Sequence, residues 1–299
     1  MNLWFSKLWV YLIKKGHVLP MGVRESLARG IAFLLWWAIP KRRHVTLTNL
    51  ALCFPELDEQ ERKALAHRVY QRLARAALDH GTLWVGSQDE IRDFVHVEGL
   101  EHFLNAINRP EAPVIIVAPH FAGLDAAGIV LSTYVKGVSL YQKQSNPVWD
   151  KAALEGRSRF MDPILVAKSD ANDLRPVIRA MRQGLPFYYL PDMDHGRQNS
   201  IFVPFFGVPA ATIPMVSRLA KLTRAKVFWC IATMTEQGYH VVFSPALDNF
   251  PTADYVADTE RLNRELEDWI RAYPDQYLWT HRRFKTRPEG EPSVYDAKH

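Results

Sequence analysis

The sequence is poor in cysteine and in recognisable modular motifs, and both shortages narrow the classes of protein that it can encode. Cys53 and Cys230 are the only cysteines among 299 residues, which argues against a disulfide scaffold and against a four-cysteine zinc site. The chain also lacks a zinc knuckle, an RNA-binding consensus and a helix-turn-helix signal, so we expect no nucleic-acid partner. It has no internal repeat, low-complexity tract or obvious linker, and 48% of its residues are hydrophobic. One domain with a sizeable core is therefore the simplest organisation.

The apolar runs near the N-terminus are short. Residues 31–39 are nine apolar residues, which as a helix span about 13 Å against a hydrocarbon core of about 30 Å. Residues 3–13 place aromatic and leucine side chains at helical spacing beside lysines, a pattern typical of a helix that lies in a membrane interface. We therefore expect residues 1–43 to form membrane-associating helices. A tilted single span beginning near Val18 and a buried aromatic core helix are the alternatives.

Acidic residues are scarce at the same end of the chain. Glu25 is the only acid in the first 43 positions, against eight lysines and arginines. Basic residues that flank an anchor favour the cytoplasmic side of a membrane. No convincing small-residue cleavage site precedes the basic run 41–43, which argues against a secretory signal. A second basic cluster, residues 281–287, suits anionic lipid or a phosphorylated substrate.

The most informative stretch is Pro113–Asp125. A short, β-branched apolar run ends in His120, and a carboxylate, Asp125, follows five positions later. Such a run is typical of a buried strand, and ligands of open α/β sheets bind at the carboxyl ends of the strands. A helix beginning just after His120 would let Asp125 turn back to the imidazole, fix its tautomer and leave the other nitrogen free to take a proton. The spacing alone is common, and an ordinary surface pair is the alternative.

Strand-like and helix-like segments alternate through the rest of the chain, which predicts an α/β fold with a mixed sheet flanked by helices over residues 44–299. Strands are expected at 113–119, 138–142, 163–167, 186–190, 226–234 and 239–244, the last two as an antiparallel pair, and helices at 58–81, 147–160, 173–183, 212–225 and 258–273. Asp58 and Glu61 have the spacing of a capping box. Residues 202–212 are expected to form an apolar loop, with Thr212 capping the helix that follows.

Two further stretches carry charged side chains of chemical interest. Arg157 and Arg159 lie near the end of an expected helix, where a functional arginine could clamp a phosphate and a structural one would face solvent. Asp192 and Asp194 follow an expected strand, so they should project from the same sheet edge as His120. Their spacing fits no common zinc motif, and an Asp-rich turn is the alternative to a functional role.

Taken together, these stretches resemble the late acyltransferases of lipid A biosynthesis, the lauroyl/myristoyl group, and the lauroyl branch more than the myristoyl branch. Five blocks carry the resemblance: residues 44–62, 118–125, 145–160, 188–214 and 277–295. The last two are long and specific. The resemblance implies the glycerolipid acyltransferase-like α/β fold. It also implies an enzyme at the cytoplasmic face of the inner membrane, in contact with its lipids.

The implied reaction moves a fatty acyl group, lauroyl-like, from acyl carrier protein to a hydroxyl of a phosphorylated lipid A precursor. His120 and Asp125 match the catalytic dyad of the superfamily, with His120 as general base and Asp125 holding the imidazole. Arg159 or Arg157 is the candidate for stabilising the oxyanion or binding a lipid A phosphate. Asp192 and Asp194 would order the site, and neither a metal nor a cofactor is required.

The basic cluster would add phosphate contacts from Arg282, Arg283 and Lys285. A glycerolipid acyltransferase of the same dyad type is an alternative, against which the block at 277–295 argues. A membrane-bound hydrolase would need a nucleophile, and the chain lacks the GxSxG elbow. A membrane-binding scaffold without catalysis would leave His120, Asp125 and the loop at Asp192 idle.

Overall fold

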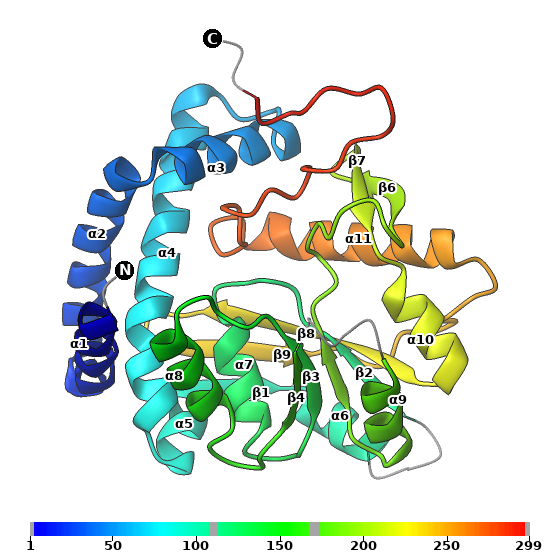
Figure 1. The fold of residues 1–299 in the computed structure, drawn as a ribbon, viewed down its shortest axis with the longest axis horizontal. Helices are drawn as coiled ribbons and strands as arrows, with labels where there is room; N and C mark the ends of the chain where they lie inside the picture. The colour runs from blue at the N-terminus through cyan, green and yellow to red at the C-terminus, as the bar shows by residue number, and fades with distance from the viewer. Residues whose placement is uncertain (1–2, 108–112, 168–173, 297–299) are drawn as a thin grey trace.

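The computed structural model describes residues 3–107, 113–167 and 174–296, and a seven-stranded sheet lies at its centre (Figure 1). The strands are β1 (Val95–Glu98), β2 (Val114–Val117), β3 (Val138–Tyr141), β4 (Ile164–Ala167), β5 (Phe187–Tyr189), β8 (Lys226–Met234) and β9 (Tyr239–Phe243). Their order is β1-β9-β8-β2-β5-β3-β4. The pairs are parallel except for β8 and β9, which form the expected antiparallel pair. The predicted mixed α/β sheet is thus confirmed.

Helices cover the sheet and extend beyond one of its ends (Figure 1). They are α1 (Leu3–Lys15), α2 (Met21–Ala38), α3 (Pro40–Cys53), α4 (Glu59–Val85), α5 (Gln88–Phe94), α6 (Leu100–Ile107), α7 (Leu124–Leu131), α8 (Pro147–Arg157), α9 (Arg175–Arg182), α10 (Met215–Thr223) and α11 (Tyr255–Ala272), with a 3₁₀ turn η1 at Gly16–Val18. The capping box of Asp58 and Glu61 forms at the start of α4, as predicted. β2 is buried at all four positions, which explains its unbroken apolar sequence.

The segment expected to be an apolar loop is a β-hairpin instead. β6 (Ile201–Phe205) pairs antiparallel with β7 (Val208–Thr212) in a separate two-stranded sheet. Phe206 and Gly207 make the turn with positive φ angles, a conformation that glycine adopts at little cost. The proposed cap is also wrong, because Thr212 ends β7 and the next helix begins only at Met215.

Buried charges tie the N-terminal helices to the sheet. The Asp79 carboxylate, on α4, is fully buried and lies 3.1 Å from Nη1 of Arg24 on α2 and 2.8 Å from Nε of Arg75. The Tyr239 hydroxyl, on β9, donates to the same carboxylate at 3.0 Å. The boundary expected after residue 43 falls inside α3. Residues of α2 also share a hydrophobic cluster with residues of the sheet, so α2 is part of the same core.

The outer faces of α1 and α2 remain apolar and exposed. Trp4 is 66% exposed and Trp37 is 64% exposed, and the exposed side chains also include Leu3, Phe5, Leu8, Trp9, Tyr11, Leu12, Val23, Leu27, Phe33 and Leu34. Within the described residues, no helix is both long and apolar enough to cross a bilayer. The single span beginning near Val18 is therefore not supported. The buried-helix alternative does not fit this face, since these side chains point to solvent.

We expect Arg24→Met to lower the free energy of unfolding by about 3 kcal/mol, because it removes one partner of a buried carboxylate. Arg29→Met is the matched control: Arg29 is on the same helix, is 64% exposed on its side chain and pairs with Glu25 at 4.0 Å, so its loss should cost less than about 1 kcal/mol. Urea unfolding in detergent, followed by tryptophan fluorescence, measures both. Equal effects would show that the buried network does not hold α2.

Candidate active site

The site is built where two adjacent parallel strands end. β2 ends at Val117 and β5 ends at Tyr189, and the two strands pair with Val117 opposite Tyr189. His120 follows the first strand by three residues and Asp192 follows the second by three residues. Because parallel strands end at one edge of a sheet, the two side chains meet there. The prediction that the Asp192 loop and His120 share this edge is confirmed.

Asp192 binds His120 through both carboxylate oxygens. Nδ1 of His120 lies 2.8 Å from Oδ1, and the backbone N–H of His120 donates to Oδ2 at 3.0 Å. Burial raises the pKa of Asp192, but the charge of His120, these hydrogen bonds and one from the Tyr277 hydroxyl outweigh it and hold the pKa well below its usual range. Asp192 is therefore ionised and can only accept hydrogen bonds, so the hydrogen lies on Nδ1 and Nε2 is left unprotonated in the neutral ring.

Asp125 does not hold His120, contrary to the expectation from its spacing. Nε and Nη2 of Arg157 lie 3.0 and 2.7 Å from its Oδ1, and Nε2 of His80 lies 2.9 Å from its Oδ2. Asp125 is the second residue of α7, and the N-terminal turn of this helix packs near α8 and α4, so its carboxylate meets side chains from those helices. Burial raises the pKa of Asp125, but Arg157 and His80 hold it well below its usual range.

Arg159 lies apart from this cluster. Its guanidinium donates to the backbone carbonyls of Leu83 and Gly86 at the C-terminal end of α4. Helix C-termini leave carbonyl groups without intrahelical partners, so Arg159 closes that end. Of the two candidate arginines, Arg157 is the one that the structure places beside Asp125.

The C-terminal basic cluster is fastened to the loop of Asp192 by Asp194. The Asp194 carboxylate accepts from the backbone N–H of Thr286 at 2.6 Å and from its hydroxyl at 2.8 Å. The Asp194 N–H donates to Nε2 of His281 at 3.1 Å. Burial lowers the pKa of His281 to about 4, so its ring is neutral near pH 7 and can accept that bond.

The three expected phosphate ligands of this cluster have different surroundings. Arg283 is buried, and it donates to the Ala211 carbonyl at 2.8 Å and to Oγ1 of Thr212 at 2.7 Å. Arg282 and Lys285 are exposed, and Lys285 lies 4.0 Å from Oδ1 of Asp194. Arg283 therefore joins the hairpin to the C-terminal segment, whereas Arg282 and Lys285 can reach a ligand.

Two residues of the site, His80 and Tyr277, escaped the sequence reasoning, and His281 was noted only as the first residue of the basic cluster. His80 comes from the middle of α4, 45 positions before its partner Asp125, and no local pattern marks it. Tyr277 and His281 lie in the block at 277–295, which the resemblance singled out only as a whole. Their place in that block was the only sign in the sequence that they belong to the site.

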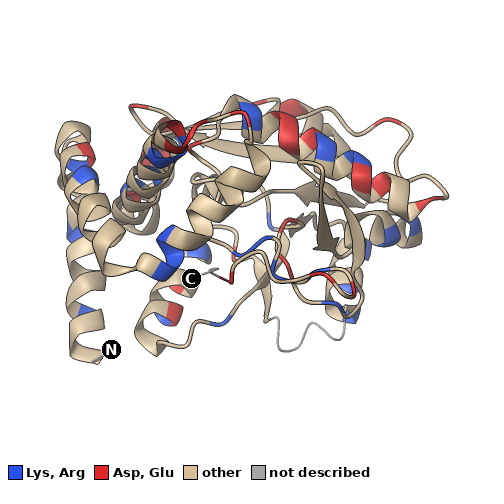
Figure 2. Cartoon of the chain, turned by 90° about the horizontal axis from the view of Figure 1, so that it is seen from above, with Lys and Arg blue, Asp and Glu red and all other residues tan. Residues whose placement is uncertain are grey.

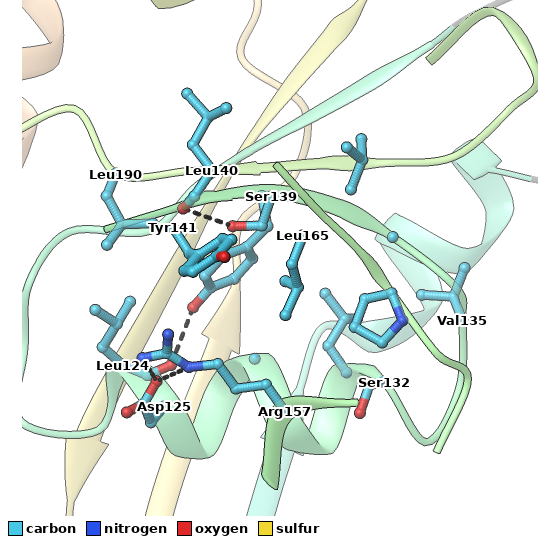
Figure 3. A pocket seen from close by; sticks show the side chains of 16 residues that line it. Leu124, Asp125, Ser132, Val135, Ser139, Leu140, Tyr141, Arg157, Leu165 and Leu190 are labelled. Carbon is cyan, nitrogen blue, oxygen red and sulfur yellow. Dashed lines mark hydrogen bonds and ion pairs between the residues drawn. The ribbon is translucent and has the colours of Figure 1, made fainter. Parts of the chain in front are cut away.

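An apolar cavity adjoins Asp125 and Arg157. It holds about 730 Å³ of empty space including its open mouth. Figure 3 shows Arg157 and Asp125 on one side of it and the side chains of Leu140, Leu165 and Val135 around it. The walls come from α7, β3, β4 and β5. A cavity of this chemistry suits a hydrocarbon chain with a polar group at the Arg157 side.

Comparisons with known proteins agree with this chemistry. A family profile described as bacterial lipid A biosynthesis acyltransferase matches residues 2–286. A lipid A biosynthesis lauroyltransferase of Escherichia coli K12 is 30% identical over 299 residues, which cover 98% of this chain and 95% of that protein. A lipid A biosynthesis myristoyltransferase of the same organism is 32% identical over 259 residues, covering 86% and 79%.

Among solved structures, the 1-acyl-sn-glycerophosphate acyltransferase PlsC of Thermotoga maritima aligns with 83% of this chain and 95% of its own, with a TM-score of 0.39 and 11% identity. That likeness is too weak to assign a shared fold. The profile match and the two curated relatives decide the matter, because they extend over most of the sequence at about 30% identity. The chain belongs to the bacterial lipid A biosynthesis acyltransferases.

Proposed function

We propose that this protein transfers a fatty acyl group from acyl carrier protein to a hydroxyl of a lipid A precursor, with His120 as the general base. The observation that carries the proposal is the hydrogen-bonded pair of His120 and Asp192 at the carboxyl edge of the sheet. The direct test mixes the purified protein with acyl-loaded carrier and a lipid A precursor. Mass spectrometry should then show the acceptor heavier by one acyl group.

His120 is suited to remove the proton of the acceptor hydroxyl. Asp192 fixes the ring with Nδ1 protonated, so Nε2 takes the proton as the hydroxyl oxygen attacks the thioester carbonyl. The buried carboxylate also stabilises the imidazolium that forms. The proton then passes to the departing thiolate, which leaves with the carrier. In this scheme Asp192 is a positioning residue for His120, and Asp125 acts by holding Arg157.

The donor chain is proposed to lie in the apolar cavity with its thioester near Arg157. Arg157 is charged, lines that cavity and is held by Asp125, so it can face the oxygen that becomes negative during the attack. Arg159 is a weaker candidate for this task, because its donors are engaged by α4. We propose a lauroyl-like donor, the chain named in the Escherichia coli lauroyltransferase that is 30% identical to this protein.

The acceptor is proposed to be anionic, and the exposed cations Arg282 and Lys285 are suited to its phosphate groups. Asp194 holds their segment against the loop of Asp192, which brings the cations to the same edge as His120. The exposed apolar faces of α1 and α2, flanked by basic residues, are proposed to rest on the cytoplasmic face of the inner membrane, where a lipid acceptor resides.

We expect His120→Ala to lower kcat by about 10²–10⁴-fold, as the loss of a general base does. Asp192→Asn should fall in the same range with a smaller change in KM, because an amide donates to Nδ1 and reverses the tautomer. The double variant should be no slower than His120→Ala alone, since Asp192 acts through the imidazole. If the two losses in kcat multiply in the double variant, Asp192 does not act through His120. If folded His120→Ala keeps the wild-type kcat, His120 is not the base.

The length of the cavity can be altered at Gly128, on α7. A Cβ added at this glycine would meet no atom within 4 Å, and Gly128 lines the cavity. We expect Gly128→Leu to lower kcat/KM for a long acyl chain about tenfold more than for one shorter by four carbons, because the added side chain occupies hydrocarbon space. Gly128→Ala is the control with a smaller effect. An unchanged chain-length preference in Gly128→Leu would place the acyl chain elsewhere.

Membrane association is best tested by substitution, because removing α2 would leave Asp79 without Arg24. We expect Trp4→Asp combined with Leu8→Asp and Leu12→Asp to lower binding to anionic liposomes by tenfold or more, since each apolar side chain contributes about 1.5–3 kcal/mol when buried. Tyr255→Asp is the matched control, because Tyr255 is 40% exposed but lies on α11. Undiminished liposome flotation of the triple variant would place the contact elsewhere.

A further inference from the structure

A second hollow lies between α9 and α10. It holds about 1480 Å³ of empty space open to solvent. Its apolar lining comes from Leu174, Ile178, Met215, Leu219 and Leu222, and Leu222 is 63% exposed. We refer to this hollow as the α9–α10 groove. An apolar groove of this size, open along two helices, is shaped for a protein segment more than for a small polar ligand.

The two helices carry positive charge only. The sequences of α9 (RPVIRAMR) and α10 (MVSRLAKLT) contain no acid. Besides Arg175, six exposed cations lie on or just after them: Arg179, Arg182, Arg218, Lys221, Arg224 and Lys226. None of the six forms an ion pair with any residue that the structure describes. Asp258, the carboxylate that α11 presents to α10, is buried and accepts from the Ser217 hydroxyl and the Thr252 N–H.

The groove adjoins both parts of the candidate active site. Tyr189, the last residue of β5, lines the groove and precedes Asp192 by three positions. Leu140 of β3 lines the groove and the apolar cavity alike. An acyl thioester that extends from a partner bound in the groove across this edge of the sheet would therefore pass His120 and reach the apolar cavity.

The groove also lies at the opposite end of the molecule from α1 and α2. Figure 1 shows α9 and α10 to the right of the sheet and the N-terminal helices to its left, and Figure 2 shows Lys and Arg at the end where α9 and α10 lie. A bilayer that contacts the exposed apolar faces of α1 and α2 is thus remote from the groove. This separation favours a soluble protein over a lipid surface as the occupant.

We infer that the α9–α10 groove is the docking surface for the acidic carrier protein that presents the acyl thioester, an inference that rests on the function proposed above. Spread over two helices, the six cations match carboxylates that are spread over a protein surface, whereas one phosphate group would engage two or three of them. The apolar floor then receives exposed apolar side chains of the carrier. Docking there delivers the acyl chain to the cavity beside Arg157 while the lipid acceptor approaches from the other side.

The test reverses charge at the rim of the groove. Arg218 lines it, and Arg182 follows the groove residue Ile178 by one helical turn. We compare Arg182→Glu with Arg218→Glu, singly and together, and use Arg68→Glu, an exposed arginine of α4, as the matched control. Each variant is assayed with the same acyl chain on the carrier and on free pantetheine. Carrier binding is measured separately by surface plasmon resonance at low salt, and circular dichroism verifies folding.

We expect the double reversal to lower the ratio of kcat/KM for carrier-bound over carrier-free donor by at least tenfold, with a matching loss of carrier binding, and Arg68→Glu to leave the ratio near that of the wild type. Salt should weaken carrier binding to the wild type more than to the double variant.

Unchanged carrier binding in the double variant would overturn the docking surface. A loss of liposome binding with intact carrier binding would assign the groove to anionic lipid instead. If the wild type transfers the acyl group from neither donor, the proposed function is wrong. The separate binding measurement would still show whether the carrier docks in the groove.

Discussion

The candidate active site depends on the carboxylate of Asp192, which links the segment after β5 to the segment after β2. Asp192 accepts from the side chain and from the backbone N–H of His120, so it fixes the loop after β2 as well as the imidazole. The cost of burying this charge is offset by those bonds and by Tyr277. The other parts of the site lie close to the pair of His120 and Asp192. Asp194, which binds the C-terminal segment, follows Asp192 by two residues, and Asp125 holds Arg157 near the same edge of the sheet.

The site therefore contains two carboxylates with separate duties. Asp192 orients the imidazole of His120, and Asp125 orients the guanidinium of Arg157, which lines the apolar cavity. Both are held ionised by their partners, which suits the proposed reaction, in which positive charge would develop on the imidazole and negative charge on the thioester oxygen. In that scheme each developing charge has a partner of opposite sign: Asp192 for the imidazolium and Arg157 for the oxyanion.

Local patterns predicted the parts of the fold that local forces decide. The buried strand before His120, the β8–β9 pair and the capping box of α4 were all legible, because alternation, turn residues and capping act over a few positions. The partner of His120 was predicted wrongly. Asp125 is five positions away in sequence and fits a local pattern, whereas the actual partner, Asp192, is 72 positions away. The β6–β7 hairpin was mistaken for a loop because two prolines interrupt its strands. His80 carried no signal, as only the packing of α4 on α7 brings it to Asp125.

The buried Arg24–Asp79–Tyr239 contact has a mechanical consequence. Because one carboxylate on α4 binds a helix on one side and a strand on the other, α2 cannot swing away from the sheet without stranding a charge in the core. Whatever surface α1 and α2 rest on, the sheet must follow as one rigid body. The height and tilt of His120 above that surface are then set by the fold, so under the proposed function an acceptor hydroxyl would have to meet His120 at one fixed height.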